Sequence, residues 1–258
     1  MLMVLSPAKK LDYDTPVRTT LQTHPVFSGE ALELVRIMQR QTPVRLARLM
    51  DLSDALARLN ADRYASWVDE PDARQGRQAA LAFNGDVYEG LRASELSDAR
   101  LSWAQDHLAI LSGLYGVLRP LDLIQPHRLE MGTALHTKRG RTLYAYWGGR
   151  IAQELNRRLD HAGGDRVLLN LASNEYFKSV DLKALQARVV DCVFQDEKNG
   201  AWKVISFYAK RARGLMARFV IDHRITSAEG LRKFDSDGYR YMADASTPDR
   251  LVFRRAHS

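Results

Sequence analysis

Apolar residues along the chain fall into two patterns, short continuous runs and runs with helical spacing. The continuous runs, each bounded by polar or turn-forming residues, predict buried strands at residues 2–5, 79–83, 166–172 and 188–194. The turn-forming stretch at residues 196–200 predicts a hairpin whose returning strand covers residues 201–208. Residues 251–254 are expected to add a last edge strand.

Apolar residues three and four positions apart predict the helices. This spacing places one helix over residues 29–41, and it recurs at residues 97–111, 148–159 and 209–223. Gly163 and Gly164 are expected to end the third of these segments. Because helices and strands are interspersed and no low-complexity linker divides them, we expect a mixed α/β (α+β) fold. It has one mixed β-sheet covered by helices, in a single domain over residues 1–258.

A helix, a short turn and a second helix are predicted between residues 43 and 64. Thr42 suits the N-cap of the first helix and Pro43 suits its first turn. Ser53 can cap the second helix in the same way. The segment is therefore predicted to form a helical hairpin.

Arginines make this hairpin a candidate for phosphate binding. Arg45 and Arg48 lie three residues apart and share a helix face. Phosphate-binding hairpins usually carry glycine in the turn, and residues 51–53 include none. Residues 112–116 supply two glycines for a phosphate-binding turn, but Pro120 would shorten any helix that follows. Each candidate turn is therefore an imperfect match to the turn of a phosphate-binding hairpin.

The net charge weakly favours polyanionic partners. The 258 residues include 38 Lys and Arg against 31 Asp and Glu, which gives a net charge of +7 and a pI of about 9.6. This balance favours polyanionic partners without reaching the charge of a histone-like protein. An ordinary basic soluble protein has the same composition, so both interpretations stay open.

Cysteine, histidine and the apolar segments indicate where the protein is located and which chemistry it can perform. The single cysteine, Cys192, excludes an intramolecular disulfide, and its apolar neighbours predict a buried thiol rather than a redox sensor. No signal peptide or membrane span is predicted, so we expect a soluble, cytoplasmic protein with no membrane contact. His127 and Glu130 are three residues apart, but two ligands do not make a metal site, and we expect no metal and no cofactor.

Polar side chains gather where the strand at residues 166–172 ends. They are Asn170, Ser173, Glu175, Tyr176 and Lys178. Open α/β folds build binding and catalytic sites at strand ends. A polar loop that caps the next element would have a similar composition, so the cluster is either a site or a cap.

Cations follow the first strand and occupy one late helix. Lys9 comes just after the first strand, at the edge where open α/β sheets bind ligands. The helix at residues 209–223 carries Lys210, Arg211, Arg213 and Arg218, with no acidic residue between the first and the last. Gly214 in this helix permits the close approach of another group. The alternative is an ordinary solvated helix face.

Six longer strings occur in order along the chain. They are LSPAK at residues 5–9, FNGDVY at 83–88, LSGLYGVLRPLD at 111–122, RLEMG at 128–132, NLASNEYF at 170–177 and SFYAKRARGLM at 206–216. Together they resemble the bacterial peroxide stress resistance protein YaaA family. Such a set is far more specific than any short motif, and on it the chain is identified as a member.

The resemblance implies a cytoplasmic protein of the oxidative stress response, associated with resistance to hydrogen peroxide and with less free intracellular iron. It also implies a helix-hairpin-helix-like element and a positively charged cleft that binds DNA. At matched positions it implies cleft cations at Lys9, Lys178, Lys210, Arg211 and Arg213, with Asn170, Ser173, Glu175 and Tyr176 beside them. Asn84 and Asn174 replace a Lys and an Asp of some relatives, so no charge-dependent role is expected there.

Two functional hypotheses follow. The first is a monomeric peroxide stress protein that binds DNA without sequence preference and protects it from oxidative damage; its DNA-binding candidates are Lys9, Arg45, Arg48, Lys178, Lys210, Arg211 and Arg213. The second is an enzyme acting on a nucleotide-like or modified-base substrate at the 170–178 cluster. There Glu175 would be the general acid/base, with Tyr176 or Lys178 as its partner. A deep pocket at that cluster would favour the enzyme, and direct iron binding has no support from ligand spacing.

Overall fold

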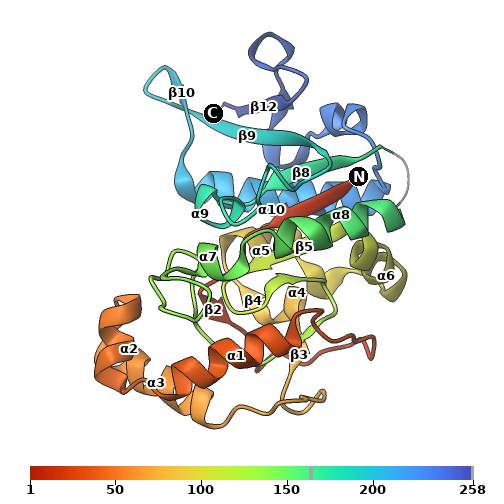
Figure 1. Cartoon of the computed structure of the whole chain (residues 1–258). Coiled ribbons are helices and arrows are strands. Elements are labelled where there is room, and N and C mark those ends of the chain that lie inside the picture. The colour runs from red at the N-terminus through yellow and green to blue at the C-terminus, as the bar shows by residue number, and fades with distance from the viewer. Residues whose placement is uncertain (163–164, 257–258) are drawn as a thin grey trace.

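The computed structural model describes residues 1–162 and 165–256 and contains one large sheet with helices on both faces (Figure 1). The strands of this sheet are β1 (Leu2–Leu5), β5 (Leu108–Ser112), β6 (Gly116–Leu118), β8 (Val167–Leu171), β9 (Arg188–Lys198), β10 (Ala201–Lys203), β11 (Arg240–Tyr241) and β12 (Arg250–Arg255). Two small ladders pair β2 (Lys10–Leu11) with β4 (Phe83–Asn84), and β3 (Arg77–Gln78) with β7 (Leu123–Ile124).

Ten α-helices occur in the described part of the chain. They are α1 (Ser28–Gln39), α2 (Pro43–Met50), α3 (Asp54–Ala65), α4 (Ala79–Ala82), α5 (Asp86–Leu91), α6 (Asp98–His107), α7 (Leu143–Trp147), α8 (Arg150–Ala162), α9 (Asn174–Phe177) and α10 (Ser206–His223). Short 3₁₀ helices lie at Ala93–Glu95, Glu229–Lys233, Ser236–Gly238 and Ala243–Ala245. None of the helices described combines the length and apolar character that crossing a membrane requires. Gly163 and Gly164, expected to end the segment that is now α8, lie outside the described residues.

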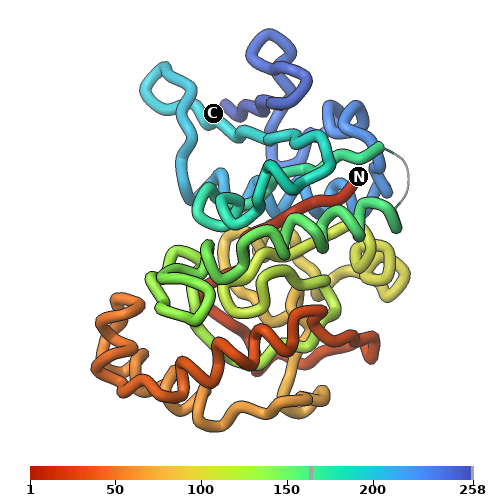
Figure 2. Tube along the Cα trace, in the orientation of Figure 1, coloured from red at the N-terminus to blue at the C-terminus, as the bar shows by residue number. Residues whose placement is uncertain are grey.

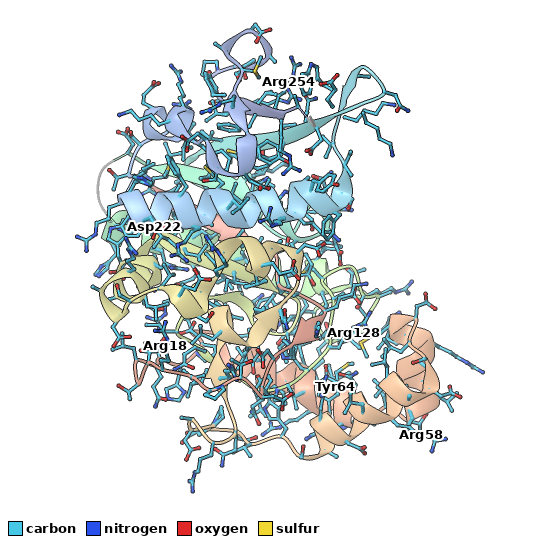
Figure 3. The ribbon with its side chains drawn as sticks, turned by 180° about the vertical axis from the view of Figure 1, so that it is seen from behind. Arg18, Arg58, Tyr64, Arg128, Asp222 and Arg254 are labelled. Carbon is cyan, nitrogen blue, oxygen red and sulfur yellow. The ribbon has the colours of Figure 1, made fainter. Side chains whose placement is uncertain are left out.

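The centre of the large sheet is parallel, which explains its sequence. The strand order is β11-β12-β9-β8-β1-β5-β6, and β12, β9, β8, β1 and β5 are parallel to one another. α8 covers one face in Figure 1, and α10 covers the other in the reverse view of Figure 3. β1 is therefore buried on both sides, and all four of its residues are apolar. Figure 2 shows this strand, in red, between segments from the second half of the chain.

The predicted helical hairpin is confirmed as α2 and α3. The Thr42 hydroxyl accepts a hydrogen bond from the backbone N–H of Arg45, and Pro43 occupies the first turn of α2. Ser53 caps α3 in the same way. At the far end of α3, the Tyr64 hydroxyl donates to the carbonyl oxygen of Arg128 at 2.9 Å, which anchors the hairpin to the body of the protein.

α10 and α5 cross at a contact made by two glycines. A Cβ added at Gly214 would lie 1.8 Å from the carbonyl oxygen of Val87. One added at Gly90 would lie 2.2 Å from the carbonyl oxygen of Arg211. The close approach that Gly214 permits is therefore to α5, so this glycine serves helix packing rather than ligand binding.

One helix prediction and one strand prediction were wrong because helix and strand patterns overlap. The helix expected over residues 97–111 ends at His107, and Leu108–Ser112 forms β5 in the centre of the sheet. Leu108 and Leu111 fit the helical spacing of the preceding residues, so periodicity could not separate the two elements. Residues 79–82, expected in a strand, form α4, and three of its four residues are alanine, which favours helices over strands.

Two further expectations about the carboxyl-terminal half were wrong. The returning strand of the 196–200 hairpin ends at Lys203, because residues 206–208 already form the first turn of α10. The last strand, β12, is not at the edge of the sheet, since it pairs with β9 on one side and β11 on the other.

The glycine-containing turn at residues 112–116 joins β5 to β6 and is buried, so it is no helical hairpin.

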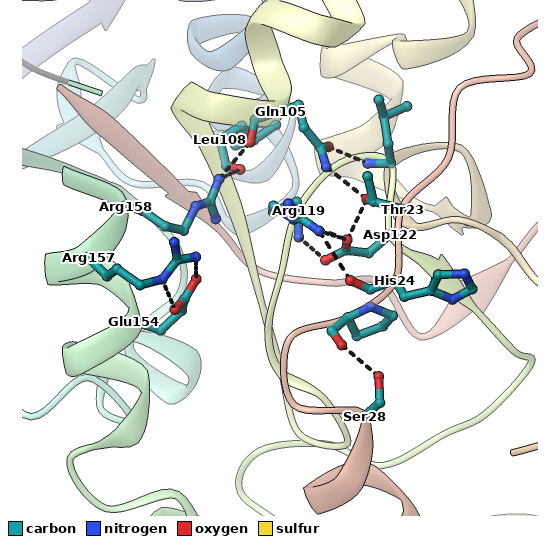
Figure 4. A network of polar contacts seen from close by, with 12 residues as sticks. Thr23, His24, Ser28, Gln105, Leu108, Arg119, Asp122, Glu154, Arg157 and Arg158 are labelled. Atoms are coloured by element: carbon teal, nitrogen blue, oxygen red, sulfur yellow. Dashed lines mark hydrogen bonds and ion pairs between the residues drawn. The ribbon is translucent and has the colours of Figure 1, made fainter. Parts of the chain in front are cut away.

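A buried polar network attaches the irregular segment before α1 to the body (Figure 4). The Thr23 hydroxyl donates to Asp122 at 2.6 Å, and the Asp122 carboxylate also accepts from the backbone N–H of Arg119. The Gln105 amide donates to Thr23 and accepts from the N–H of Leu121. Burial raises the pKa of Asp122, and these hydrogen bonds and the Arg119 guanidinium oppose that rise. The network is structural, because the hydrogen bonds of Thr23, Gln105 and Asp122 join separate parts of the chain.

Candidate functional site

The carboxyl ends of β1 and β8 mark the point where the connections of the sheet diverge. β1 lies between β8 and β5, and the chain continues from β1 to β5 on one side but from β8 to β9 on the other. Open α/β sheets bind ligands outside the strand ends at such a divergence. A pocket of about 460 Å³ lies there, lined by residues that follow both strands.

Three serines at the ends of neighbouring strands line this pocket. Ser6 follows β1, Ser112 ends β5 and Ser173 follows β8. The backbone N–H of Ser173 donates to the Ser6 hydroxyl at 2.8 Å, and that hydroxyl lies 3.3 Å from the Ser173 hydroxyl. The hydrogen bonds fix the two strand ends relative to each other.

Basic side chains outnumber carboxylates in the lining, five to three, and most are paired. Glu130 accepts from Lys9 at 2.8 Å and from Arg128 at 2.9 Å. Lys210 lies 3.7 Å from Asp86, a distance that gives only a weak ion pair at an exposed position. These contacts hold the rim of the pocket in place and leave a small excess of positive charge.

Arg213 differs from the other cations of the pocket. Its side chain projects from α10 into the lining, yet it makes no hydrogen bond or ion pair with any residue that the structure describes. Burial lowers the pKa of this guanidinium, and the nearby Cys192 is itself a buried thiol whose pKa is raised by burial. A partly buried cation without a counter-ion is stabilised by an anionic ligand, so Arg213 makes the pocket a candidate anion site.

His127 and Tyr176 supply neutral polar groups to the same lining. The Nδ1 atom of His127 lies 2.7 Å from the carbonyl oxygen of Gln125, which can only accept, so Nδ1 carries the proton and Nε2 is an acceptor. Burial lowers the pKa of His127 to about 4, which keeps the ring neutral near pH 7. Burial and the Glu175 carboxylate raise the pKa of Tyr176, so its hydroxyl stays protonated.

Glu175 is held beside these groups by the loop at residues 126–132. Its Oε1 atom accepts the backbone N–H of Gly132 at 2.9 Å. The carboxylate borders the pocket together with Glu130 and Tyr176. The lining thus presents cations, carboxylates, hydroxyls and a neutral imidazole, a set suited to binding an anionic ligand and to acid–base chemistry on it.

Comparisons with known proteins find similar proteins that cover nearly the whole chain. A family model described as peroxide stress protein YaaA matches residues 1–245. The chain belongs to this family. It is 62% identical over 256 residues to a UPF0246 protein of Bordetella petrii, with 99% of each chain covered. It is 61% identical over 255 residues to a UPF0246 protein of Bordetella pertussis, at the same coverage. A UPF0246 protein of Delftia acidovorans is 60% identical over 257 residues, covering 99% of this chain and 98% of that one.

The resemblance found in the sequence is therefore confirmed, and the family match includes every residue that lines the pocket. Of the seven candidate DNA-binding cations, the structure brings three into the pocket: Lys9, Lys210 and Arg213. From the polar cluster it adds Ser173, Glu175 and Tyr176.

The other candidates lie elsewhere. Asn170 donates to Asp191 and accepts the backbone N–H of Ala172. The Lys178 ammonium stands over the ring of Tyr144, 5.1 Å from its centre. Arg211 forms an ion pair with Asp237. Arg45 and Arg48 are exposed on α2.

The pocket residues that sequence reasoning missed as site candidates include Ser6, Ser112, His127, Arg128 and Glu130. Ser6 carried a usable signal, because it ends the first apolar run. The other signals were weaker, since residues 127–130 belong to an irregular loop with no periodic pattern. Within residues 1–162 and 165–256, no three His, Cys, Asp or Glu side chains gather as a metal site.

Proposed function

We propose that this member of the peroxide stress family binds DNA without sequence preference and thereby protects it from oxidative damage. The observation that carries the proposal is a set of cations without partners among the described residues: Arg213 in the pocket, and Arg45 and Arg48 on α2. Such cations are available to phosphate groups, because no carboxylate among the described residues is paired with them.

The hydrogen bond between Tyr64 and Arg128 supports the joint use of these cations. It joins α3, the second helix of the hairpin, to the loop that carries Arg128 into the pocket (Figure 3). One DNA molecule is thus proposed to contact the hairpin and the pocket together. Asp51 and Asp54 flank the turn of the hairpin, so the arginine side chains of α2, rather than the turn amides, are proposed to meet the phosphates.

Lower free iron, which the family resemblance implies, enters the proposal as an indirect effect. Bound protein would exclude iron and peroxide from the DNA surface that it covers. This account requires no iron site on the protein, whose contribution is the occupation of the phosphate backbone.

Fluorescence anisotropy with a labelled duplex across a salt series tests the proposal. The logarithm of the affinity should fall with the logarithm of the salt concentration, with a slope of about −0.9 for each phosphate contact. Arg213→Gln should weaken binding and reduce that slope by about one. The Arg45→Gln, Arg48→Gln double variant should reduce it by about two.

Arg74→Gln is the matched control, since it removes the charge of an exposed arginine that is already paired with Asp72. It should leave affinity and slope unchanged. Equal losses in all three variants would indicate a general effect of net charge and would refute the assignment of these cations. Absence of salt-sensitive binding by the unaltered protein would refute DNA binding itself.

A second candidate function is an enzyme acting on a nucleotide-like or modified-base substrate. The observation that favours it is the meeting of Glu175, Tyr176 and His127 in a pocket beside the unpaired Arg213. Glu175 would act as general acid/base, with Tyr176 as a hydrogen-bond donor, while Arg213 holds a phosphate. Lys178 has no part in this version, because it lies over Tyr144 rather than in the lining.

Mass spectrometry of a peroxide-treated oligonucleotide tests this candidate. The unaltered protein should change the mass of modified strands, and Glu175→Gln should slow that change at least 100-fold. The same oligonucleotide without peroxide treatment is the control. If no strand changes mass, or if Glu175→Gln is as active as the unaltered protein, the enzyme candidate fails.

A further inference from the structure

His127 presents a hydrogen-bond acceptor for which the described part of the chain provides no donor. The residue is 6% exposed, and because Nδ1 donates to the carbonyl oxygen of Gln125, Nε2 is the acceptor. No residue in the ranges 1–162 and 165–256 donates a hydrogen bond to Nε2. The atom is not sealed from solvent, and the accessible space that His127 borders is the pocket at the ends of β1 and β8.

Tyr176 presents the complementary group, a hydroxyl donor. This residue is 8% exposed, and the backbone N–H of Met131 is directed at its oxygen, which leaves the hydroxyl proton for another acceptor. Among the described residues none accepts that proton. Like Nε2 of His127, the hydroxyl is not sealed from solvent, and its residue lines the same pocket. A buried polar group without a partner costs free energy, so both groups favour a ligand that satisfies them.

The loop at residues 126–132 holds the two groups on one side of the pocket. His127 belongs to this loop, and Met131 of the same loop contacts the Tyr176 hydroxyl. The ring of Tyr115 packs edge-on against the His127 imidazole, with 5.3 Å between the ring centres, which restricts the plane of the imidazole. The acceptor and the donor are therefore in position before a ligand binds.

Arg213 adds a positive charge to these two neutral groups. It lines the same pocket from α10 and has no hydrogen bond or ion pair with any described residue. A ligand that satisfies all three carries an anionic group and, apart from it, a neutral edge with a hydrogen-bond donor beside an acceptor. A nucleotide has both, because every base carries donors and acceptors on the edge that pairs in a duplex. The pocket volume of about 460 Å³ is within the range of pockets that hold ligands of this size.

We propose that His127 and Tyr176 bind the base edge of a single unpaired nucleotide whose phosphate contacts Arg213. In a duplex the pairing partner occupies that edge, so a paired nucleotide cannot make these contacts. A free nucleotide and an extrahelical nucleotide of a strand offer the same groups, and binding assays separate the two sources. The inference rests on the proposed contact of Arg213 with phosphate, and it adds which part of the nucleotide the pocket recognises.

Calorimetric titration with thymidine 5′-monophosphate, and with deoxyribose 5-phosphate, which lacks the base, tests the recognition of the base. His127→Asn keeps a donor for the carbonyl oxygen of Gln125 but loses the acceptor at Nε2, and Tyr176→Phe loses only the hydroxyl. Each variant should bind the thymidine nucleotide roughly 5- to 50-fold more weakly. Affinity for deoxyribose phosphate should change less than about twofold, because its contact is with Arg213.

His136→Asn and Tyr241→Phe are the matched controls, since both side chains lie outside the pocket. They should change the affinity for neither ligand. Fluorescence anisotropy then compares a duplex that carries one extrahelical thymidine with the same duplex fully paired. If a strand supplies the nucleotide, the first duplex should bind at least about fivefold more tightly, and His127→Asn should remove that preference. If the free nucleotide is the ligand, the two duplexes should bind equally and the dependence should appear in the calorimetry alone.

Nitrogen NMR of protein labelled at its histidine side chains gives a readout that a structural role would not change. The Nε2 resonance that His127→Asn removes should move upfield when the thymidine nucleotide binds, because Nε2 then accepts a hydrogen bond, and deoxyribose phosphate should leave it in place. An unmoved resonance, or equal losses for both ligands in the variants, would overturn the inference. If Arg213→Gln still weakens duplex binding in that case, only this inference fails; if Arg213→Gln weakens binding of no probe, the proposed phosphate contact fails with it.

Discussion

Arginines on one helix, α10, have different environments inside and outside the pocket. Arg213, in the pocket, has no hydrogen bond or ion pair among the described residues. Outside it, Arg211 pairs with Asp237, and Arg218 pairs with Asp222 at 2.8 Å and donates to the carbonyl oxygen of Arg92 at 3.1 Å. The comparison shows that a run of cations in a sequence overstates the charge available to a ligand. The cation without a partner is a candidate for function, and the paired ones stabilise the fold.

The largest effect is expected where α10 is held against α5, because this contact sets the direction of all its side chains. Gly214→Ala would place a Cβ only 1.8 Å from the carbonyl oxygen of Val87, so the two helices would have to separate. We expect a loss of more than about 3 kcal/mol in the free energy of unfolding. Urea denaturation followed by circular dichroism measures it.

Gly29→Ala is the control for this substitution, because a Cβ at Gly29 in α1 meets nothing within 4 Å. There the change should stabilise the protein slightly, since alanine favours the helix by about 1 kcal/mol. A Gly214→Ala variant as stable as the unaltered protein would show that the helices are not locked by this contact.

The second-largest effect concerns His127, the neutral ring that lines the pocket. His127 has a folded-state pKa of about 4, below its ordinary value of 6.5, because burial opposes its charged form. Between these values the unfolded chain binds a proton that the folded chain does not. Stability is therefore fully present above pH 6.5 and falls as the pH approaches 4, by about 2 kcal/mol from pH 6.5 to pH 5 for this residue.

His127→Asn separates this effect from the other titrating groups. Its amide can still donate to the carbonyl oxygen of Gln125, but it does not titrate. Urea denaturation at pH 7 and pH 5 should therefore show a smaller fall in stability for the variant than for the unaltered protein. An identical fall in both proteins would mean that His127 does not control stability in this pH range.

Local signals predicted the elements that depend on local interactions. The apolar run of β1, the caps of α2 and α3 and most of α10 were readable, because each is specified by residues a few positions apart. β5 was not, because its leucines continue the spacing of α6 and only its place between β1 and β6 shows that it is a strand.

Residues of the pocket were predictable from the sequence only where local signals place them. Ser173, Glu175 and Tyr176 were predicted because they follow a strand, whereas His127 and Glu130 reach the pocket through an irregular loop that only tertiary structure places. The pairing of Arg211 depends on Asp237, 26 residues further on, and was not predictable. The pairing of Arg218 with Asp222 was predictable, since Asp222 is four residues later on the same helix.

The smallest effect tests the comparison directly, by replacing each arginine with methionine, which keeps much of the stem but removes the charge. Arg218→Met removes the ion pair with Asp222 and the hydrogen bond to Arg92, so we expect it to lower the free energy of unfolding by about 1.5 kcal/mol. Arg213→Met removes a cation that has no partner, so stability should stay the same or rise.

DNA affinity should show the opposite order, because Arg213→Met removes a cation proposed to contact phosphate and Arg218→Met does not. Urea denaturation and anisotropy on the same two variants therefore separate a ligand-binding arginine from a structural one. If Arg213→Met destabilises the protein as much as Arg218→Met does, then Arg213 has a structural role, and its lack of a partner would no longer indicate a site. If both variants keep full DNA affinity, the pocket face of α10 does not contact DNA, and the exposed arginines of α2 alone would carry the proposed binding.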